Sequence, residues 1–321
     1  MKNILYNKRA ELTTRQIVLL VILVTSFAII LFFIFRLNLQ QESVKEICHN
    51  SVVLRGNAAL PTAKQTIPLN CRQAYVCVTQ DGTCERMSSY DYRIVVKDKD
   101  EFYSAMAEEL ADCWWTYGEG KVDYVGKDAL SRNNYCSLCS QLRFDDSIKE
   151  KIFPSGKVDK DDFYKNYLAK EKMPGKDITY AQYLFGTNDV GELVKINNPD
   201  TKQPVQGSFG ELNLDKKDAD GELYDYVVMM GIKSEISTFT WIAGGAVVGI
   251  VVGALIASGV GFVAGAIIIG VAGTAGAIGG YTYIATTVKG LSGRAYISPT
   301  IVAYNSPEYR SLNCAEIKTL S

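Results

Sequence analysis

The sequence predicts a membrane protein of α+β class, with most of its mass outside the membrane. Three observations support this fold class. Two apolar blocks, 17–35 and 241–280, are long enough for helices that cross a bilayer, which takes roughly 20 apolar residues per span. All eight cysteines lie outside these blocks and after the first one. Between the blocks, residues 37–240 mix strand-like and helix-like segments, as an α+β external domain does.

The first apolar block predicts a transmembrane helix over residues 17–36. It is rich in branched and aromatic side chains and is bounded by Arg15 and Arg36. A cleaved signal peptide is the alternative, since it would have a similar apolar core. Phe32, Phe33 and Phe35 stand where small residues would form a cleavage site, and this favours an uncleaved anchor.

The charges around the first block predict its orientation. Residues 1–16 hold a single acidic residue, Glu11, against four basic ones, Lys2, Lys8, Arg9 and Arg15. Because positive charge stays on the cytoplasmic side, the N-terminus is predicted to be cytoplasmic and residues 37–240 extracytoplasmic, at the cell membrane. The external region carries 25 basic and 32 acidic residues, which argues against nucleic acid as a partner.

The second apolar block predicts a glycine-rich helical hairpin in the lipid bilayer. Residues 236–288 carry no charge, and the block is about twice the length of one span. We expect transmembrane helices at 241–257 and 262–285, a turn between them, and an external tail at 286–321 that packs on the ectodomain. Trp241 and Tyr283 near the block's ends suit the two membrane interfaces.

Small residues recur along this block at every fourth position, in a pattern called a glycine zipper. Such spacing lets helix backbones approach closely in lipid. The face can pack against the chain's own spans, or it can join a second copy or another membrane protein. Its members are Gly245, Gly249, Gly253, Ala257, Gly261 and Gly265.

The cysteines predict a disulfide framework of up to four bridges in an oxidising compartment. They are Cys48, Cys71, Cys77, Cys84, Cys113, Cys136, Cys139 and Cys314. Their spacing leaves the connectivity open. Cys314 lies beyond the predicted hairpin, and only a return of the chain to the outside lets it pair with the others. Cys136 and Cys139 also have the C-x-x-C spacing of a redox pair or a zinc site, but no βαβ pattern and no second knuckle pair accompany them.

Local patterns predict the elements of the ectodomain. Residues 37–70 read as a linker, and 92–97 as a strand. An amphipathic helix follows Asp98 and ends near Gly118. Its last turn holds Trp114 and Trp115. These two side chains pack in the core, or alternatively form an exposed recognition patch.

The second half of the ectodomain is predicted to hold two more helices and to end in a strand. The helices are expected at 163–173 and 179–186, and residues 187–221 read as loop or edge strand. The strand at 222–233 is expected to pair with one at 294–305, in which Pro299 requires a sheet edge or a bulge.

The residues that catalysis or metal binding would need are scarce. His49 is the only histidine, which disfavours histidine-based triads. Residues 215–221 look like part of a calcium loop, but they lack acidic residues at the first and last ligand positions. There is no phosphate-binding or dinucleotide-binding motif. We therefore expect no catalytic residues, no metal and no cofactor.

Two short segments, DCWWTYGEG at 112–120 and NYCSLC at 134–139, carry a resemblance. They resemble a pattern in uncharacterised archaeal membrane-anchored, cysteine-containing envelope proteins, and this resemblance implies no activity. The sequence as a whole predicts a non-catalytic integral membrane protein of the cell envelope. The alternatives are a pore-forming or membrane-remodelling protein and an extracytoplasmic thiol–disulfide protein that uses Cys136 and Cys139.

Overall fold

The computed structural model divides the chain into two compact units, Met1–Ser43 and Val44–Ser321. The structure describes residues 14–36, 39–59, 64, 66–125, 134–193, 195–197, 204–206, 208–217, 221, 223–233, 241–243, 246–248, 256–257, 263–269, 283–292, 294–306, 309–310, 312 and 314–316.

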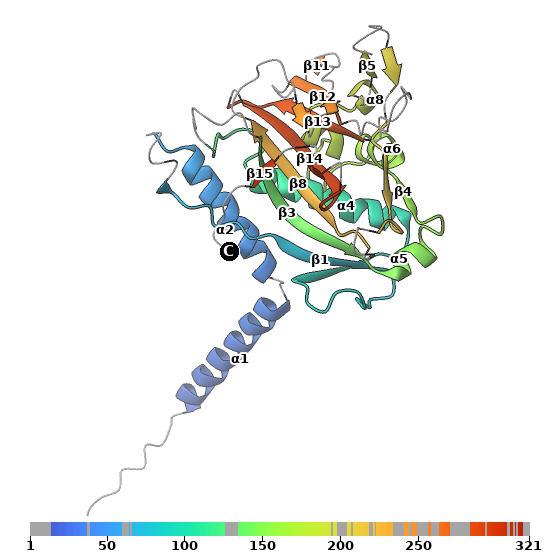
Figure 1. Cartoon of the computed structure of the whole chain (residues 1–321). Coiled ribbons are helices and arrows are strands. Elements are labelled where there is room, and N and C mark those ends of the chain that lie inside the picture. The colour runs from blue at the N-terminus through green and yellow to red at the C-terminus, as the bar shows by residue number, and fades with distance from the viewer. Residues whose placement is uncertain are drawn as a thin grey trace, which may run out of the picture. The chain divides into compact units, whose positions relative to one another are not determined.

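The first unit holds the predicted apolar helix, α1 (Thr14–Arg36; Figure 1). Its window Arg15–Phe32 has a mean hydropathy of 2.4, and none of it is buried. Thr25 and Ser26 direct their hydroxyls to carbonyls one turn back, so these polar groups stay satisfied in an apolar setting. Within the described residues, α1 is the one helix long and apolar enough to span a membrane, and a signal sequence near the N-terminus has the same properties.

The second unit is built on a nine-stranded mixed sheet. Its main path runs in the order β11, β12, β13, β14, β8, β3, β1, β2, and β15 pairs with β3. The strands are β1 (Ala74–Thr79), β2 (Tyr92–Val95), β3 (Asn134–Phe144), β8 (Tyr226–Lys233), β11 (Ile256–Ala257), β12 (Val263–Ile269), β13 (Tyr283–Lys289), β14 (Ala295–Ala303) and β15 (Cys314–Glu316).

Three predicted strands and one predicted pairing are confirmed. The strands correspond to β2, β8 and β14. β8 and β14 pair antiparallel, from Ala295 opposite Lys233 to Ala303 opposite Tyr226. The register shifts between Ile297 and Thr300, which is the bulge that Pro299 requires because proline has no N–H to donate.

Both faces of the sheet are covered at β8. Val228, Met230 and Ile232 point into the main core, while Val227 and Met229 point into a smaller cluster on the opposite face. Side chains of a strand alternate between faces, so an apolar run such as YVVMMGI fits a strand buried on both sides. The smaller cluster is closed by residues near the C-terminus, among them Tyr309 and Leu312.

Helix α4 (Lys99–Thr116) packs across one face of the sheet, against β3, β8 and β14 (Figure 1). It starts where the sequence predicts. The Asp98 carboxylate accepts from the Glu101 N–H at 2.9 Å, and the Glu101 carboxylate accepts from the Lys97 N–H at 2.8 Å. The first bond satisfies one of the donors that a helix N-terminus otherwise leaves open, and the second ties the residue before the cap to the first turn.

The other predicted helices are shorter in the structure. The helix expected at 163–173 is α6 (Lys160–Asp162) followed by a π-helical turn, η1 (Phe163–Leu168). The helix expected at 179–186 is α7 (Tyr180–Phe185), which Thr179 caps and Gly186 ends with φ +74°. The remaining short elements are α5 (Asp146–Lys151), α8 (Val190–Leu193), β4 (Lys157–Asp159), β5 (Lys195–Asn197), β6 (Pro204–Gln206) and β7 (Glu211–Asn213).

The linker predicted at 37–70 is wrong over most of its length. Residues 39–56 form helix α2 (Leu39–Gly56). Its buried positions Cys48, Ser51 and Val52 follow helical spacing, but two of them are small and weakly apolar. Cys48 is joined to Cys71, so a long-range covalent bond supports a helix that its own apolar pattern marks weakly.

The predicted membrane hairpin falls largely outside the described residues, at 244–245, 249–255, 258–262 and 270–282. The described parts of this stretch are strands: β9 (Trp241–Ala243), β10 (Ala246–Val248), β11, β12 and the first three residues of β13. Of the small-residue stripe, Ala257 lies in β11 and Gly265 in β12, while the other four members are not described. The two-span hairpin stays a prediction.

Candidate functional site

All eight cysteines are disulfide-bonded, which confirms the predicted framework. The bridges are Cys48–Cys71, Cys77–Cys84, Cys113–Cys139 and Cys136–Cys314. The last one closes a loop of 178 residues and joins β3 to β15. It therefore ties the chain after the glycine-rich stretch to the chain before it.

The C-x-x-C cysteines point to opposite faces of the sheet. Cys136 belongs to the small cluster on one face, whereas Cys139 packs against the main core on the other. Residues three apart on a strand differ by an odd number of positions, so they face opposite ways. Each therefore bridges a different partner, and the geometry gives no support to a Cys136–Cys139 redox pair.

A β-bulge at Cys139 makes two consecutive residues of β3 face helix α4. Leu138 lies opposite Met229 and Ser140 opposite Val228, which leaves Cys139 as the extra residue. Cys139 bonds to Cys113, and Ser140 donates a hydrogen bond of 2.7 Å to Glu109, one turn earlier on α4. The bulge fixes α4 on the sheet through a disulfide and a polar contact.

Glu109 is a buried carboxylate, 6% exposed, at the centre of this contact. It accepts a second hydrogen bond from the Tyr92 hydroxyl at 2.6 Å. Burial raises the pKa of the Glu109 carboxyl, and the hydrogen bonds and the charge of Lys45 oppose this shift. Because the carboxyl is enclosed, its role is to join α4, β2 and β3 rather than to meet a substrate.

The two candidate recognition tryptophans have different surroundings. Trp114 is 1% exposed and packs edge-on against Tyr296 at 5.9 Å between ring centroids, so it lies in the core. Trp115 is half-buried, and its ring stacks on His49 at 4.1 Å. The Trp115 carbonyl is 2.7 Å from Nδ1 of His49 and can only accept, so Nδ1 carries a proton. Only Trp115 retains exposed surface.

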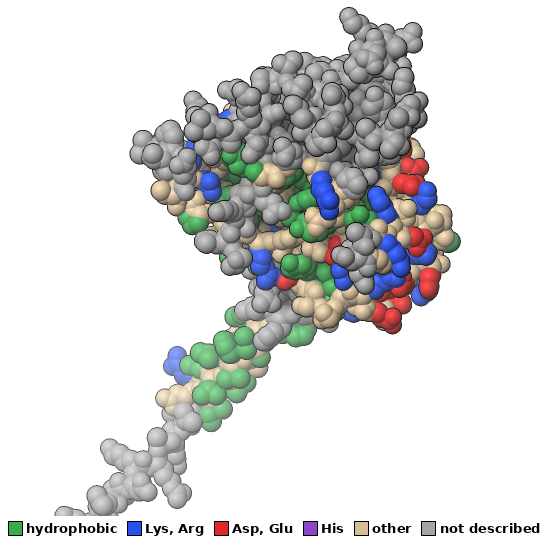
Figure 2. Space-filling view, in the orientation of Figure 1, with side chains coloured by type: hydrophobic (Ala, Val, Ile, Leu, Met, Phe, Trp, Pro, Cys, Tyr) green, Lys and Arg blue, Asp and Glu red, His purple; other side chains and the backbone are tan. Residues whose placement is uncertain are grey.

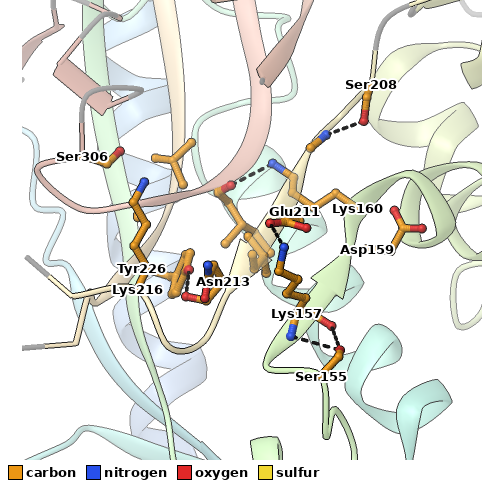
Figure 3. Close-up of a pocket in the computed structure, with 15 residues that line it drawn as sticks. Ser155, Lys157, Asp159, Lys160, Ser208, Glu211, Asn213, Lys216, Tyr226 and Ser306 are labelled. Carbon is orange, nitrogen blue, oxygen red and sulfur yellow. Dashed lines mark hydrogen bonds and ion pairs between the residues drawn. The ribbon is translucent and has the colours of Figure 1, made fainter. Parts of the chain in front are cut away.

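A pocket of about 750 Å³ lies beside the two-stranded ribbon of β4 and β7. Val158 and Leu212 are register partners in this ribbon, and both are buried, which orients the alternate residues Lys157 and Glu211 toward solvent. The opposite wall comes from the start of β8 and the end of β14 (Figure 3). Segments far apart in the sequence thus build one cavity.

Lysines are prominent in this pocket. Lys157 pairs with Glu211 across the ribbon at 2.8 Å. Lys160 is 3% exposed and extends from α6 to donate to the Ile301 carbonyl at 3.0 Å, as Figure 3 shows. The ammonium of Lys160 also lies 5.8 Å from the Tyr164 ring centre. Lys216 is half-buried on the other side, near Tyr226 in the view.

The carboxylates at the pocket have structural partners. The Asp159 carboxylate accepts from the N–H groups of Asp161 and Asp162, at 2.8 and 3.3 Å, and so begins α6. The surrounding surface mixes basic and acidic side chains over β4, α5 and α6 (Figure 2). Among the described residues, no group of three or more His, Cys, Asp and Glu side chains is arranged to hold a metal ion.

The sequence did not indicate this pocket. Its lysines come from separate segments, at 157–160 and 216, and its far wall from 301–306. Neither spacing nor composition links those segments. The pairing of β4 with β7 and of β8 with β14 brings them together.

No protein-family model matches this chain, and neither a curated protein nor a solved structure matches it.

Proposed function

We infer that this chain is a non-catalytic integral membrane protein of the cell envelope. Helix α1 would anchor it, and unit 44–321 would form an extracytoplasmic domain. The observation that carries the proposal is the complete pairing of eight cysteines, because stable structural disulfides form in oxidising compartments. The basic segment before α1 and the acidic balance after it support the same orientation.

The Cys136–Cys314 bridge supports the proposal that the chain after the glycine-rich stretch lies on the same side of the membrane as the chain before it. Lys233, before the glycine-rich stretch, is the register partner of Ala295, after it. A stretch that begins and ends at one place in a sheet is compatible with an even number of membrane crossings, such as one hairpin. In that arrangement the uncharged run 236–288 would enter the bilayer as two helices, in place of the strands β9 to β12 and the start of β13.

Thiol counting in isolated membranes tests the compartment. The full chain is expressed with its N-terminal segment intact, denatured without reductant and treated with a maleimide of known mass. We expect no label without reductant and eight labels after reduction, because all eight cysteines are paired. Free thiols in freshly isolated membranes would contradict an oxidising location. Deletion of 1–36 is the matched control, since it should leave the protein in the reducing cytosol with labelled thiols.

The uncharged glycine-rich run also favours a second candidate function, pore formation or membrane remodelling. In this case the hairpin would assemble with other copies in the bilayer. Purified full-length protein in liposomes would then release a trapped dye or ions. Liposomes that stay tight at the same protein density would exclude this function, while leaving the anchored-domain proposal intact.

A further inference from the structure

We propose that the outward side of helix α4, together with two tyrosines beside it, binds a linear aliphatic polyamine. The site consists of the carboxylates of Asp100, Glu108 and Glu171 and the hydroxyls of Tyr167 and Tyr180, and we call it the acidic stripe. All of it belongs to unit 44–321, so the inference depends neither on the membrane anchor nor on the glycine-rich stretch.

The three carboxylates of the acidic stripe carry charge that the chain leaves uncompensated. Asp100, Glu108 and Glu171 are exposed, and none of their side chains has a salt bridge or hydrogen bond to another described residue. Lys45 acts on Glu108 but is already paired with Asp112. Partial burial and then the charge of Asp112 raise the pKa of the Glu108 carboxyl, so its negative form is disfavoured here. A bound cation would stabilise that form.

Tyr180 gives a second observation that is independent of the carboxylates. Its side chain is 2% exposed, yet its hydroxyl has no hydrogen-bond partner within the described part of the chain. Buried tyrosine hydroxyls usually have one. Burial and then the charge of Glu108 raise the pKa of Tyr180, which places the hydroxyl within electrostatic reach of that carboxylate. An ammonium group in the stripe would donate to the hydroxyl oxygen and so provide the partner.

Backbone and ring contacts hold Glu171 and the two tyrosines beside α4. The Glu171 N–H donates to the Tyr167 carbonyl at 2.8 Å, and the Tyr180 N–H donates to the Glu171 carbonyl at 3.1 Å. The rings of Tyr167 and Tyr180 are 6.5 Å apart between centroids. Tyr167 also packs edge-on against Tyr103 of α4, at 5.7 Å. The site therefore has a fixed frame, built from two segments of the chain.

The spacing of the carboxylates favours an extended cation over a metal ion. Asp100 and Glu108 are separated by about 12 Å along the axis of α4, from their positions in the helix. Oxygen ligands of Ca²⁺ lie within about 2.6 Å of the ion, so one ion cannot contact both carboxylates. A linear polyamine carries ammonium groups along an aliphatic chain, and each can meet a different carboxylate. The half-buried ring of Tyr167 adds a surface that attracts cations.

Calorimetric titration of the full chain in a non-ionic detergent tests the proposal, with spermidine as the probe at about 0.15 M salt. Butylamine is the control with a single ammonium group, and Mg²⁺ is the control for unspecific attraction of cations. We expect spermidine to bind with a dissociation constant at or below about 1 mM. Each control should bind at least about tenfold more weakly, because neither can contact two separate carboxylates.

Two variants and one control locate the binding. Glu108→Gln removes one carboxylate and should weaken spermidine binding by about tenfold. Tyr180→Phe removes only the hydroxyl and should weaken binding by about fivefold, as the loss of one hydrogen bond does. Its melting temperature should not fall, because this hydroxyl bonds to no other described residue. Glu150→Gln, at an exposed position of α5, should bind as wild type does.

Three results would overturn the proposal. The first is no measurable heat with spermidine at about ten times the expected dissociation constant. The second is binding of butylamine or Mg²⁺ as tight as that of spermidine, which would reduce the stripe to unspecific charge. The third is wild-type affinity in either stripe variant, with circular dichroism and thiol counting to confirm folding. If Tyr180→Phe does not fold, Glu108→Gln alone decides. None of these results bears on the cysteine pairing or on the anchor.

Discussion

At the scale of single residues, Glu109 makes a pH-dependent contribution to stability. Its pKa is raised in the folded protein by burial, so folding favours the protonated form. This contribution is fully present below the ordinary glutamate pKa and is lost as pH rises from there through the raised value. Each pKa unit of difference corresponds to about 1.4 kcal/mol.

We therefore expect the effect of Glu109→Gln to change with pH. The glutamine stays neutral, so relative to wild type the variant should gain stability between pH 4 and pH 7. Urea unfolding at both pH values measures the free energies. Glu150→Gln, at an exposed position of α5, is the control. A difference between Glu109→Gln and wild type that is the same at both pH values would contradict the assignment.

At the scale of elements, capping residues and apolar runs in the sequence predicted the helix ends and strands that depend on neighbouring residues. Asp98 with Glu101 marks the start of α4, Thr179 and Gly186 bound α7, and apolar runs mark β8 and β14. Helix α2 was missed because Cys48 and Ser51 become buried through a distant disulfide and through packing. The pocket was missed for a similar reason, since it depends on sheet register and no local pattern encodes register.

The glycine-rich stretch gives a prediction about helix packing in the membrane. If Gly249 and Gly253 form a small-residue face, Gly249→Leu and Gly253→Leu should each lower the thermal stability of the detergent-solubilised protein, because leucine holds helix backbones apart. Val247→Leu, off the four-residue spacing, should be close to neutral. Melting followed by circular dichroism measures the effect.

Crosslinking in membranes then distinguishes packing of this face within one chain from assembly between copies. A ladder of oligomers that weakens in Gly249→Leu would indicate assembly between copies. An unchanged ladder would confine the face to packing within one chain. Wild-type melting in both glycine variants would contradict a packing role altogether.

At the scale of the whole molecule, we expect each disulfide to contribute to the free energy of unfolding according to the length of the loop that it closes. In the chain-entropy account, a bridge stabilises mainly by restricting the unfolded chain, and more so for longer loops. Cys77–Cys84 closes 7 residues, Cys113–Cys139 closes 26 and Cys136–Cys314 closes 178. The last bridge also holds β15 beside β3, which covers the small core cluster.

We expect the paired variant Cys136→Ser with Cys314→Ser to be destabilised by about 5 kcal/mol, and Cys77→Ser with Cys84→Ser by about 2 kcal/mol, from their loop lengths. The two pairs control for each other, since each removes one bridge without leaving a free thiol. Urea unfolding of the detergent-solubilised protein measures both values. Limited proteolysis should in addition cut the tail near Cys314 only in the first pair, because that bridge alone ties the tail covalently to the sheet. Equal losses in the two pairs, or a protected tail without its bridge, would mean that packing rather than the covalent link holds the C-terminus to the domain.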